Sequence, residues 1–168
     1  MHFPNLTIHV KEIDTVEAIP ALENGDIDLA FARLEGDLGN HIASRPLIRE
    51  HLAVALPEKH PLAAHQEVSL SQLSQEQFIM FARKISPLSY DILTGMCRKQ
   101  GFFPKVIHEV RSVASQIAFV GCGQGIALVP QSITRFSYPN VVILPLAEHL
   151  EFITTAMAWR SDCLLYTS

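Results

Sequence analysis

The chain has 168 residues, of which 48% are hydrophobic and 18% are charged, and its formal net charge is −4. This length accommodates one domain with a full core or two small lobes. No apolar run reaches the roughly 20 residues that a membrane-spanning helix needs, and the scattered basic residues argue against a face that grips nucleic acid. The three cysteines are odd in number and far apart, which favours reduced thiols in a cytoplasmic protein.

The first thirty residues predict a strand, a helix and a second strand. Apolar and polar side chains alternate over residues 6–10, as in a strand with one buried face. Asp14 and Glu17 have the spacing of a capping box for a helix from Thr15 to about Glu23. A second apolar strand follows over residues 27–31. This order is typical of a βαβ unit, so we expect a parallel sheet.

The rest of the chain divides into short apolar segments bounded by glycine, proline and polar residues. The predicted elements are a weak strand at 42–47, a stronger strand at 52–56, a helical turn within 69–77, a strand at 78–81, a helix over 88–101, a strand at 106–110, a helix from 113 to 121, a buried strand at 126–129, a short helix at 131–136, and strands at 141–144 and 153–158.

The glycine-rich stretch in the middle of the chain predicts a turn. Ser112 can cap a helix that stops at Gly121, and Gly123 and Gly125 then lead into a buried strand. A phosphate-binding loop has the opposite order, in which the glycines precede the N-terminus of a helix. Because these glycines follow a helix C-terminus, we interpret them as a tight helix-to-strand connection.

The residue types that usually carry metal or nucleophilic chemistry show no such spacing here. Of the eight histidines only His60 and His65 are close, and Pro61 between them breaks any helix that would align them. We expect solvated loop histidines and no metal. Cys122 lies between two glycines without a nucleophile elbow, so we expect a small buried residue. No catalytic residue and no cofactor are predicted.

Two positions carry a functional hypothesis from their spacing alone. Thr15 stands at a helix N-terminus, where free backbone N–H groups and a hydroxyl can hold an anion. Arg33 follows the next strand, at the edge where open α/β sheets bind ligands. Together they would grip a carboxylate. The alternative is a capping residue and a surface arginine, and spacing alone favours this alternative.

Six short motifs occur in a characteristic order. They are Phe3-Pro4-Asn5-Leu6, the segment 24–30 (Asn-Gly-Asp-Ile-Asp-Leu-Ala), His60-Pro61-Leu62-Ala63, Gly101-Phe102 with Pro104, Glu109-Val110, and the segment 123–130 (Gly-Gln-Gly-Ile-Ala-Leu-Val-Pro). In this order and spacing they resemble the C-terminal effector-binding domain of LysR-type transcriptional regulators, in particular the group that senses aromatic acids. The resemblance covers about residues 3 to 160.

This resemblance implies an α/β fold of two Rossmann-like lobes, as in type 2 periplasmic binding proteins, joined by two crossover strands. Lobe I would comprise residues 1–52 and 132–168, and lobe II residues 53–131. The crossovers would fall near Leu56-Pro57 and Val129-Pro130. Lobe I would be incomplete, because the family's first strand and the helix after it have no counterpart in these 168 residues.

The resemblance also implies the effector contacts and the partners. The residues carried over by motif are Thr15 and Arg33 in lobe I, Arg83, Ser86 and Ser89 in lobe II, and Pro130 and Gln131 at the return crossover. The expected ligand is a small organic acid. The family's DNA-binding helix-turn-helix is also missing here, so DNA contact and homo-oligomer formation are expected of the whole protein, without membrane contact. Residues 161–168 depart from the family pattern.

Two other functions stay open at this point. A solute-binding protein of a transporter would have the same fold, and an upstream signal sequence would identify it. An enzyme on a doubly wound fold is the third possibility, although no nucleophile–base pair or cofactor loop is evident in the sequence.

Overall fold

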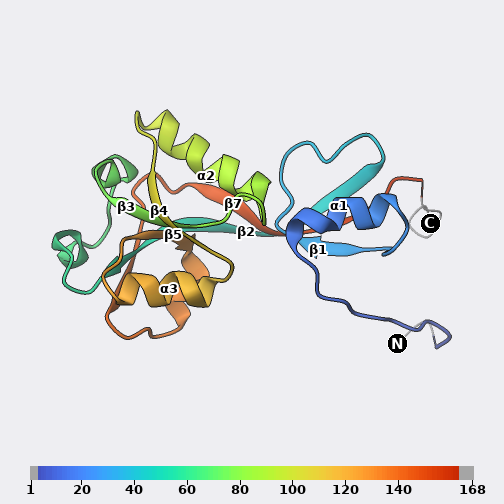
Figure 1. The fold of residues 1–168 in the computed structure, drawn as a ribbon, viewed down its shortest axis with the longest axis horizontal. Coiled ribbons are helices and arrows are strands. Elements are labelled where there is room, and N and C mark those ends of the chain that lie inside the picture. Colours follow the sequence, from blue (N-terminus) through green and yellow to red (C-terminus); the bar gives the residue numbers. More distant parts are fainter. Residues whose placement is uncertain (1–3, 163–168) are drawn as a thin grey trace.

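The computed structural model describes residues 4–162, which fold into two groups of elements connected by long strands (Figure 1). One group contains α1 and β1, the other contains α2, α3, β3, β4 and β5, and β2 and β7 extend between the two groups. The bounds are α1 Thr15–Glu23, β1 Ala30–Ala32, β2 Ile42–Pro57, η1 Pro61–Ala64, η2 Leu70–Leu73, β3 Gln77–Phe81, α2 Pro87–Lys99, β4 Lys105–Val110, α3 Val113–Gly121, β5 Ala127–Pro130, η3 Gln131–Arg135, β6 Val141–Pro145 and β7 Glu151–Arg160.

The first group, which we call lobe I, is a three-stranded antiparallel sheet with one helix on it. β7 lies between β1 and the first half of β2 and pairs with both. α1 begins at the predicted capping box and contributes Ala18 and Leu22 to a small core with Ile153, Ala156 and Ala158 of β7. Pro20 lies inside this helix, which continues past it to Glu23.

The second group, lobe II, is built on the second half of β2. β5 and β6 pair with this half on its two edges. β3 joins β5 through a parallel bridge between Phe78 and Ile126, and β4 pairs parallel with β3. Lobe II is therefore a mixed sheet that reaches from β6 to β4.

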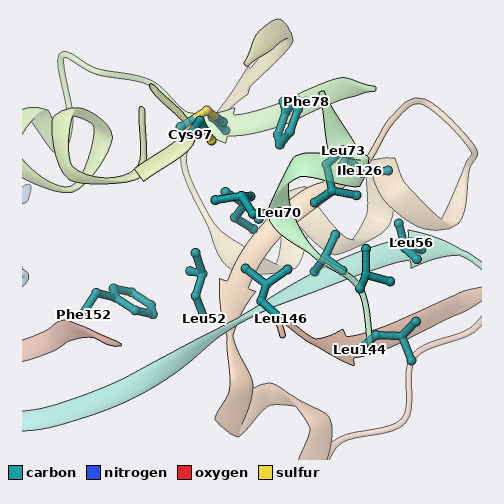
Figure 2. Close-up of a cluster of buried hydrophobic side chains, with 14 residues drawn as sticks. Leu52, Leu56, Leu70, Leu73, Phe78, Cys97, Ile126, Leu144, Leu146 and Phe152 are labelled. Atoms are coloured by element: carbon teal, nitrogen blue, oxygen red, sulfur yellow. The ribbon is translucent and has the colours of Figure 1, made fainter. Parts of the chain in front are cut away.

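The residues of β2 alternate between two cores because successive side chains of a strand point to opposite faces. Leu52, Val54 and Leu56 lie in the cluster that contacts α2, which Figure 2 shows around Phe78 and Cys97. Ala53 and Ala55 face α3 on the other side, where Ile117 and Val120 pack. Figure 1 shows α2 and α3 on opposite faces of this sheet, so lobe II has three layers.

The predicted parallel βαβ unit at the start of the chain is wrong. Residues 6–10 are not a strand, and β1 pairs antiparallel with β7. Leu6, Ile8 and Val10 are all exposed. An extended segment becomes a strand only when a neighbour satisfies its N–H and C=O groups, and β1 lies at the edge of its sheet without taking residues 6–10 as a partner.

The crossings between the lobes lie at other residues than those predicted near Leu56-Pro57 and Val129-Pro130. β2 changes its partner from β7 to β5 and β6 between His51 and Leu52, so the first crossing precedes Leu56. β6 pairs with Ala53–Pro57 and therefore belongs to the lobe II sheet, whereas the sequence analysis placed all of residues 132–168 in lobe I. We place the second crossing between β6 and β7, because only β7 pairs with lobe I strands.

The glycine turn after α3 is confirmed. Cys122 caps α3, Gly123 has φ +72° and Gly125 has φ +152°, and β5 follows. A Cβ atom at Gly125 would lie 2.7 Å from the carbonyl oxygen of Gln77 in β3. The glycine is required because the turn passes against the backbone of the neighbouring strand. Over residues 4–162, no helix combines the length and the apolar character that crossing a membrane demands.

Candidate functional site

A pocket of about 220 Å³ lies between the lobes, where the N-termini of α1 and α2 face each other. Three of its lining residues come from α1, three come from the segment after β1, and two come from the start of α2. The lining residues are Thr15, Val16, Ile19, Leu34, Asp37, Leu38, Pro87 and Leu88. The walls are mostly apolar, with Thr15 and Asp37 as the polar side chains.

Most backbone N–H groups at the start of α1 already have hydrogen-bond partners. The backbone N–H of Asp14 donates to Oε2 of Glu17 at 3.0 Å, which completes the capping box. Thr15, the first helical residue, is half-buried. The N–H of Val16, the second helical residue, donates to the carbonyl oxygen of Ile85 in lobe II at 3.1 Å. One of the N–H groups that lack a partner within α1 is therefore already bonded to the other lobe.

The start of α2 holds a buried hydroxyl. Ser86 is the N-cap residue of α2 and is only 5% exposed. Within the described part of the chain its Oγ atom has no hydrogen-bond partner. Ser89 lies in the first turn of the same helix and is half-buried. Ser86 and Ser89 are not among the lining residues themselves, but they flank Pro87 and Leu88, which are. A buried hydroxyl without a partner is costly, so Ser86 is a candidate for a ligand contact beside the pocket.

Arg33 contacts both lobes. It follows β1 in lobe I, and its guanidinium lies 5.0 Å from the centre of the Phe81 ring, at the end of β3 in lobe II. Burial lowers the pKa of Arg33, and the negative charge of Glu50 acts in the opposite direction. Leu34, its neighbour in sequence, lines the pocket. Arg33 itself lies beside the pocket and is absent from its lining.

Glu50 anchors the crossing strand to η3. Its Oε1 atom accepts a hydrogen bond from the backbone N–H of Ser132 at 3.2 Å. Burial opposes ionisation of Glu50, but the hydrogen bonds from Ser132 and Thr154 and the charge of Arg33 outweigh it, so the pKa of Glu50 is lowered. Arg33 therefore faces a carboxylate that is ionised at neutral pH.

The remaining predicted contacts lie apart from the pocket. Arg83 makes a bidentate ion pair with Asp91 at 2.9 and 2.8 Å on the exposed surface of lobe II, and the hydrogen bonds that it donates to Asp91 raise the pKa of Arg83. Pro130 is buried opposite Leu52, and Gln131 is exposed at the start of η3. The structure thus brings Thr15 close to the segment that holds Ser86 and turns Arg83 outwards.

Several side chains at this site could not be predicted from the sequence pattern. Phe81 and Glu50 lie inside strands, where an apolar or alternating pattern gives no sign of a polar contact. Leu34 and Leu38 are spaced four residues apart in a loop that contains no other apolar residue, and this pair was the one available signal for the pocket wall.

Two expectations about reactive side chains need correction. His60 is not a solvated loop residue. Its side chain is 14% exposed, and its Nε2 atom lies 2.9 Å from Oε1 of Glu76, while Nδ1 accepts from the N–H of Leu62. Cys122 is exposed rather than buried. In residues 4–162 no cluster of three or more histidine, cysteine, aspartate or glutamate side chains is arranged to hold a metal ion.

A second, more open groove of about 390 Å³ lies along η3 and β6, with Arg135, Phe136 and Tyr138 among its lining residues. It is larger than the pocket between the lobes. However, it contains none of the predicted contacts, and no unpartnered buried polar atom among the described residues belongs to it. The interlobe pocket is therefore the better candidate for a ligand site.

Comparison with known proteins identifies related chains. The family described as the LysR substrate binding domain matches residues 1–165. The chain is 30% identical over 158 residues to the HTH-type transcriptional regulator BudR of Raoultella terrigena. This match covers 94% of the chain and 54% of BudR. It is 32% identical over 148 residues to the HTH-type transcriptional regulator BenM of Acinetobacter baylyi. This match covers 86% of the chain and 48% of BenM.

Solved structures show the same arrangement. The BenM effector binding domain with its effector benzoate superposes with a TM-score of 0.80 at 30% identity, over 95% of this chain and 72% of that one. HinK, a LysR family transcriptional regulator from Pseudomonas aeruginosa, gives a TM-score of 0.79 at 28% identity, over 95% of this chain and 56% of HinK. The predicted fold class, two α/β lobes of the type 2 periplasmic-binding-protein kind, is confirmed.

The chain spans about half the length of the curated relatives that it matches. The match to the family nevertheless runs over nearly all of its residues, and it agrees with the order of motifs, the two lobes and the crossing strands. The chain belongs to the LysR substrate-binding domain family.

Proposed function

We propose that this chain is the effector-sensing part of a LysR-type transcriptional regulator and binds a small organic acid in the interlobe pocket. The observation that carries the proposal is the pairing of two helix N-termini at one pocket, with Thr15 on one helix and the buried, unpartnered hydroxyl of Ser86 capping the other. The relatives are transcriptional regulators, which favours this function over solute transport.

The chemistry of the pocket suits an acid with an apolar body, whose carboxylate would lie at the helix N-termini and away from Asp37. Helix N-termini present free N–H groups and a partial positive charge, which together stabilise a carboxylate. The hydroxyls of Thr15 and Ser86 would add charge-assisted hydrogen bonds. Ile19, Leu34 and Leu88 form apolar walls against which a ring or an alkyl chain would pack.

The relatives narrow the class of ligand. The BenM effector binding domain has been solved with benzoate, an aromatic acid, and it is 30% identical to this chain over the residues that match. An aromatic monocarboxylate is therefore the first ligand to test here, and a dicarboxylate such as muconate is the second. Thr15 and Asp37 are the polar side chains of the described lining, and both can bind a ligand.

The mechanism follows from the position of the pocket. A ligand that contacts α1 and α2 at once favours the arrangement in which the lobes are close, and so shifts an equilibrium between two arrangements of the chain. In the whole protein this shift would alter a homo-oligomer that contacts DNA through a helix-turn-helix outside these residues. The chain itself would make no specific contact with DNA.

Titration calorimetry with benzoate and with muconate tests the proposal directly. We expect one of the two acids to bind, and we expect Ser86→Ala and Thr15→Val each to weaken binding by about 1 kcal/mol, the typical contribution of one hydrogen bond. Thr134→Val, a change at an exposed threonine of η3, is the matched control. Equal affinity in Ser86→Ala, Thr15→Val and the parent would contradict the site.

A further inference from the structure

Two contacts tie the lobes together beside the pocket. Oδ2 of Asp14 lies 2.9 Å from Nη2 of Arg111, which connects residues 97 positions apart in the sequence. The N–H of Val16 donates to the carbonyl oxygen of Ile85 at 3.1 Å. Asp14 and Val16 flank Thr15 of the pocket, and Ile85 lies two residues before Pro87 on the opposite wall. Both contacts therefore lie beside the pocket.

The backbones at both ends of the ion pair are fixed. Asp14 is the N-cap of α1, and the capping box with Glu17 sets its position. Arg111 stands between the last residue of β4 and Ser112, whose side chain caps α3 by accepting from the N–H of Ser115. The geometry of the ion pair therefore depends on the relative position of lobe I and lobe II, because neither backbone can adjust independently of its lobe.

We propose that Arg111 is a positioning residue for the effector pocket and acts through Asp14, holding the start of α1 against the segment of lobe II that ends at α2. Naming the pocket as an effector site rests on the function proposed above. The ion pair does not need to contact the effector. It raises the share of molecules in which both walls of the pocket are in place before the effector arrives.

The strength of this contact suits a reversible closure. The side chains of Arg111 and Asp14 are 65% and 45% exposed, and ion pairs so open to water contribute little and are screened by salt. Loss of the pair should lower the closed-to-open ratio by about twofold to fivefold. An effector that bridges the two walls would supply the remaining preference for the closed arrangement.

The Val16 amide provides a readout that needs no ligand. It is the second N–H of α1 and has no acceptor within its own helix, so its protection against hydrogen exchange comes from Ile85 in the other lobe. We expect residue-resolved exchange of Val16 to be about twofold to fivefold faster in Arg111→Gln than in the parent at low salt. High salt should speed exchange in the parent and leave the variant unchanged.

Arg98→Gln is the matched control, because Arg98 is also an exposed arginine of lobe II, but it stacks on Phe103 within its own lobe. This variant should leave Val16 exchange unchanged. Asp14→Asn keeps a residue that caps helices well but removes the charge, so it should speed exchange as much as Arg111→Gln does. The double variant should then add no further acceleration.

Benzoate affinity, measured separately, tests the connection to the pocket. We expect a twofold to fivefold higher Kd for Arg111→Gln at low salt, and a parent-like Kd for Arg98→Gln. Unchanged Val16 exchange in Arg111→Gln would overturn the proposal, whether or not benzoate binds. Faster exchange in a chain that binds no acid would support the closure and contradict the proposed function.

Discussion

Arg33 is predicted from the sequence as an effector contact, and the structure places its side chain between the two lobes. It was singled out because it follows a strand at the ligand-binding edge of an α/β sheet. In the structure it stacks on Phe81 of the other lobe and faces Glu50 of the crossing strand. A planar guanidinium can stack and form hydrogen bonds at the same time, which a lysine cannot do.

We therefore expect Arg33→Ala to weaken binding of an acid effector by about 1.5–3 kcal/mol, the range for hydrogen bonds to charged groups. Arg33→Lys should recover only part of this loss, because it restores the charge without the planar group. Titration calorimetry of the parent and both variants measures the effect. An unchanged Kd in Arg33→Ala, for an acid that binds the parent, would restrict Arg33 to a structural contact with Phe81.

The lowered pKa of Glu50 predicts that this residue contributes to the stability of the fold in a pH-dependent way. Because the pKa of Glu50 is lowered in the folded chain, its ionised form stabilises the fold above the unfolded pKa of about 4.3, and this contribution is lost as the pH falls through the lower folded pKa. We expect Glu50→Gln to lower the free energy of unfolding by about 0.5–1.5 kcal/mol at pH 7 and by much less near pH 3.

Urea denaturation at the two pH values measures this difference, with Glu58→Gln at an exposed turn as the control. A deficit in Glu50→Gln that persists at low pH would mean that the shape of the side chain, rather than its charge, stabilises the crossing.

The two described cysteines should differ in reactivity. Burial raises the pKa of Cys97 to about 11, so its thiol stays protonated and shielded at pH 8, whereas Cys122 is exposed. We expect iodoacetamide to modify Cys122 within minutes and Cys97 only after unfolding. Peptide mass spectrometry separates the two sites, and fast modification of Cys97 in folded protein would contradict its burial in the lobe II core.

At the scale of the elements, the turn between α3 and β5 is the feature that depends most on one residue. Gly125 passes so close to β3 that a methyl group would meet the Gln77 carbonyl at 2.7 Å. The same contact region contains the hydrogen bonds between Ile126 and β3 that connect the two halves of the lobe II sheet. The turn therefore determines how β5 joins β3.

We expect Gly125→Ala to destabilise the chain by about 2–4 kcal/mol, since the backbone of β3 would have to move away. Gly95→Ala is a suitable comparison. Gly95 lies inside α2 with open space around it, and alanine there should stabilise the chain by about 0.5–1 kcal/mol. Thermal unfolding of both variants tests the pair, and equal melting temperatures would show that β3 adapts easily.

For the whole molecule, the exposed apolar segment before α1 is the most conspicuous feature. Leu6, Ile8 and Val10 point into solvent, and β1 ends the lobe I sheet with Phe31 exposed. An unpaired strand edge next to an extended apolar segment favours pairing between chains. We therefore expect the 168-residue chain to self-associate as its concentration rises.

Sedimentation velocity over a range of concentrations measures this association. Val10→Lys should reduce it, because a charge on the segment opposes strand pairing. Phe103→Lys removes an exposed apolar residue from lobe II instead and should leave association unchanged. A monodisperse monomer at all concentrations would contradict this expectation.

The sequence by itself determined the local elements, because their causes are local. The capping box at Asp14, the apolar stripe of α2 and the glycines after α3 act within a few residues, and each predicted element from β3 to β7 lies within a few residues of its observed bounds. The ordered motifs then identified the two-lobed fold, which no single segment indicates.

Tertiary structure decided which strands pair and which side chains meet. β6 belongs to lobe II because it finds β2 as a partner, and residues 6–10 find none. Arg83 turns outwards to Asp91, the Oγ atom of Ser86 finds no hydrogen-bond partner within residues 4–162, and Arg111 reaches Asp14 from the other lobe. These outcomes depend on contacts between residues far apart in the chain, and the composition and periodicity of a local segment carry no information about them.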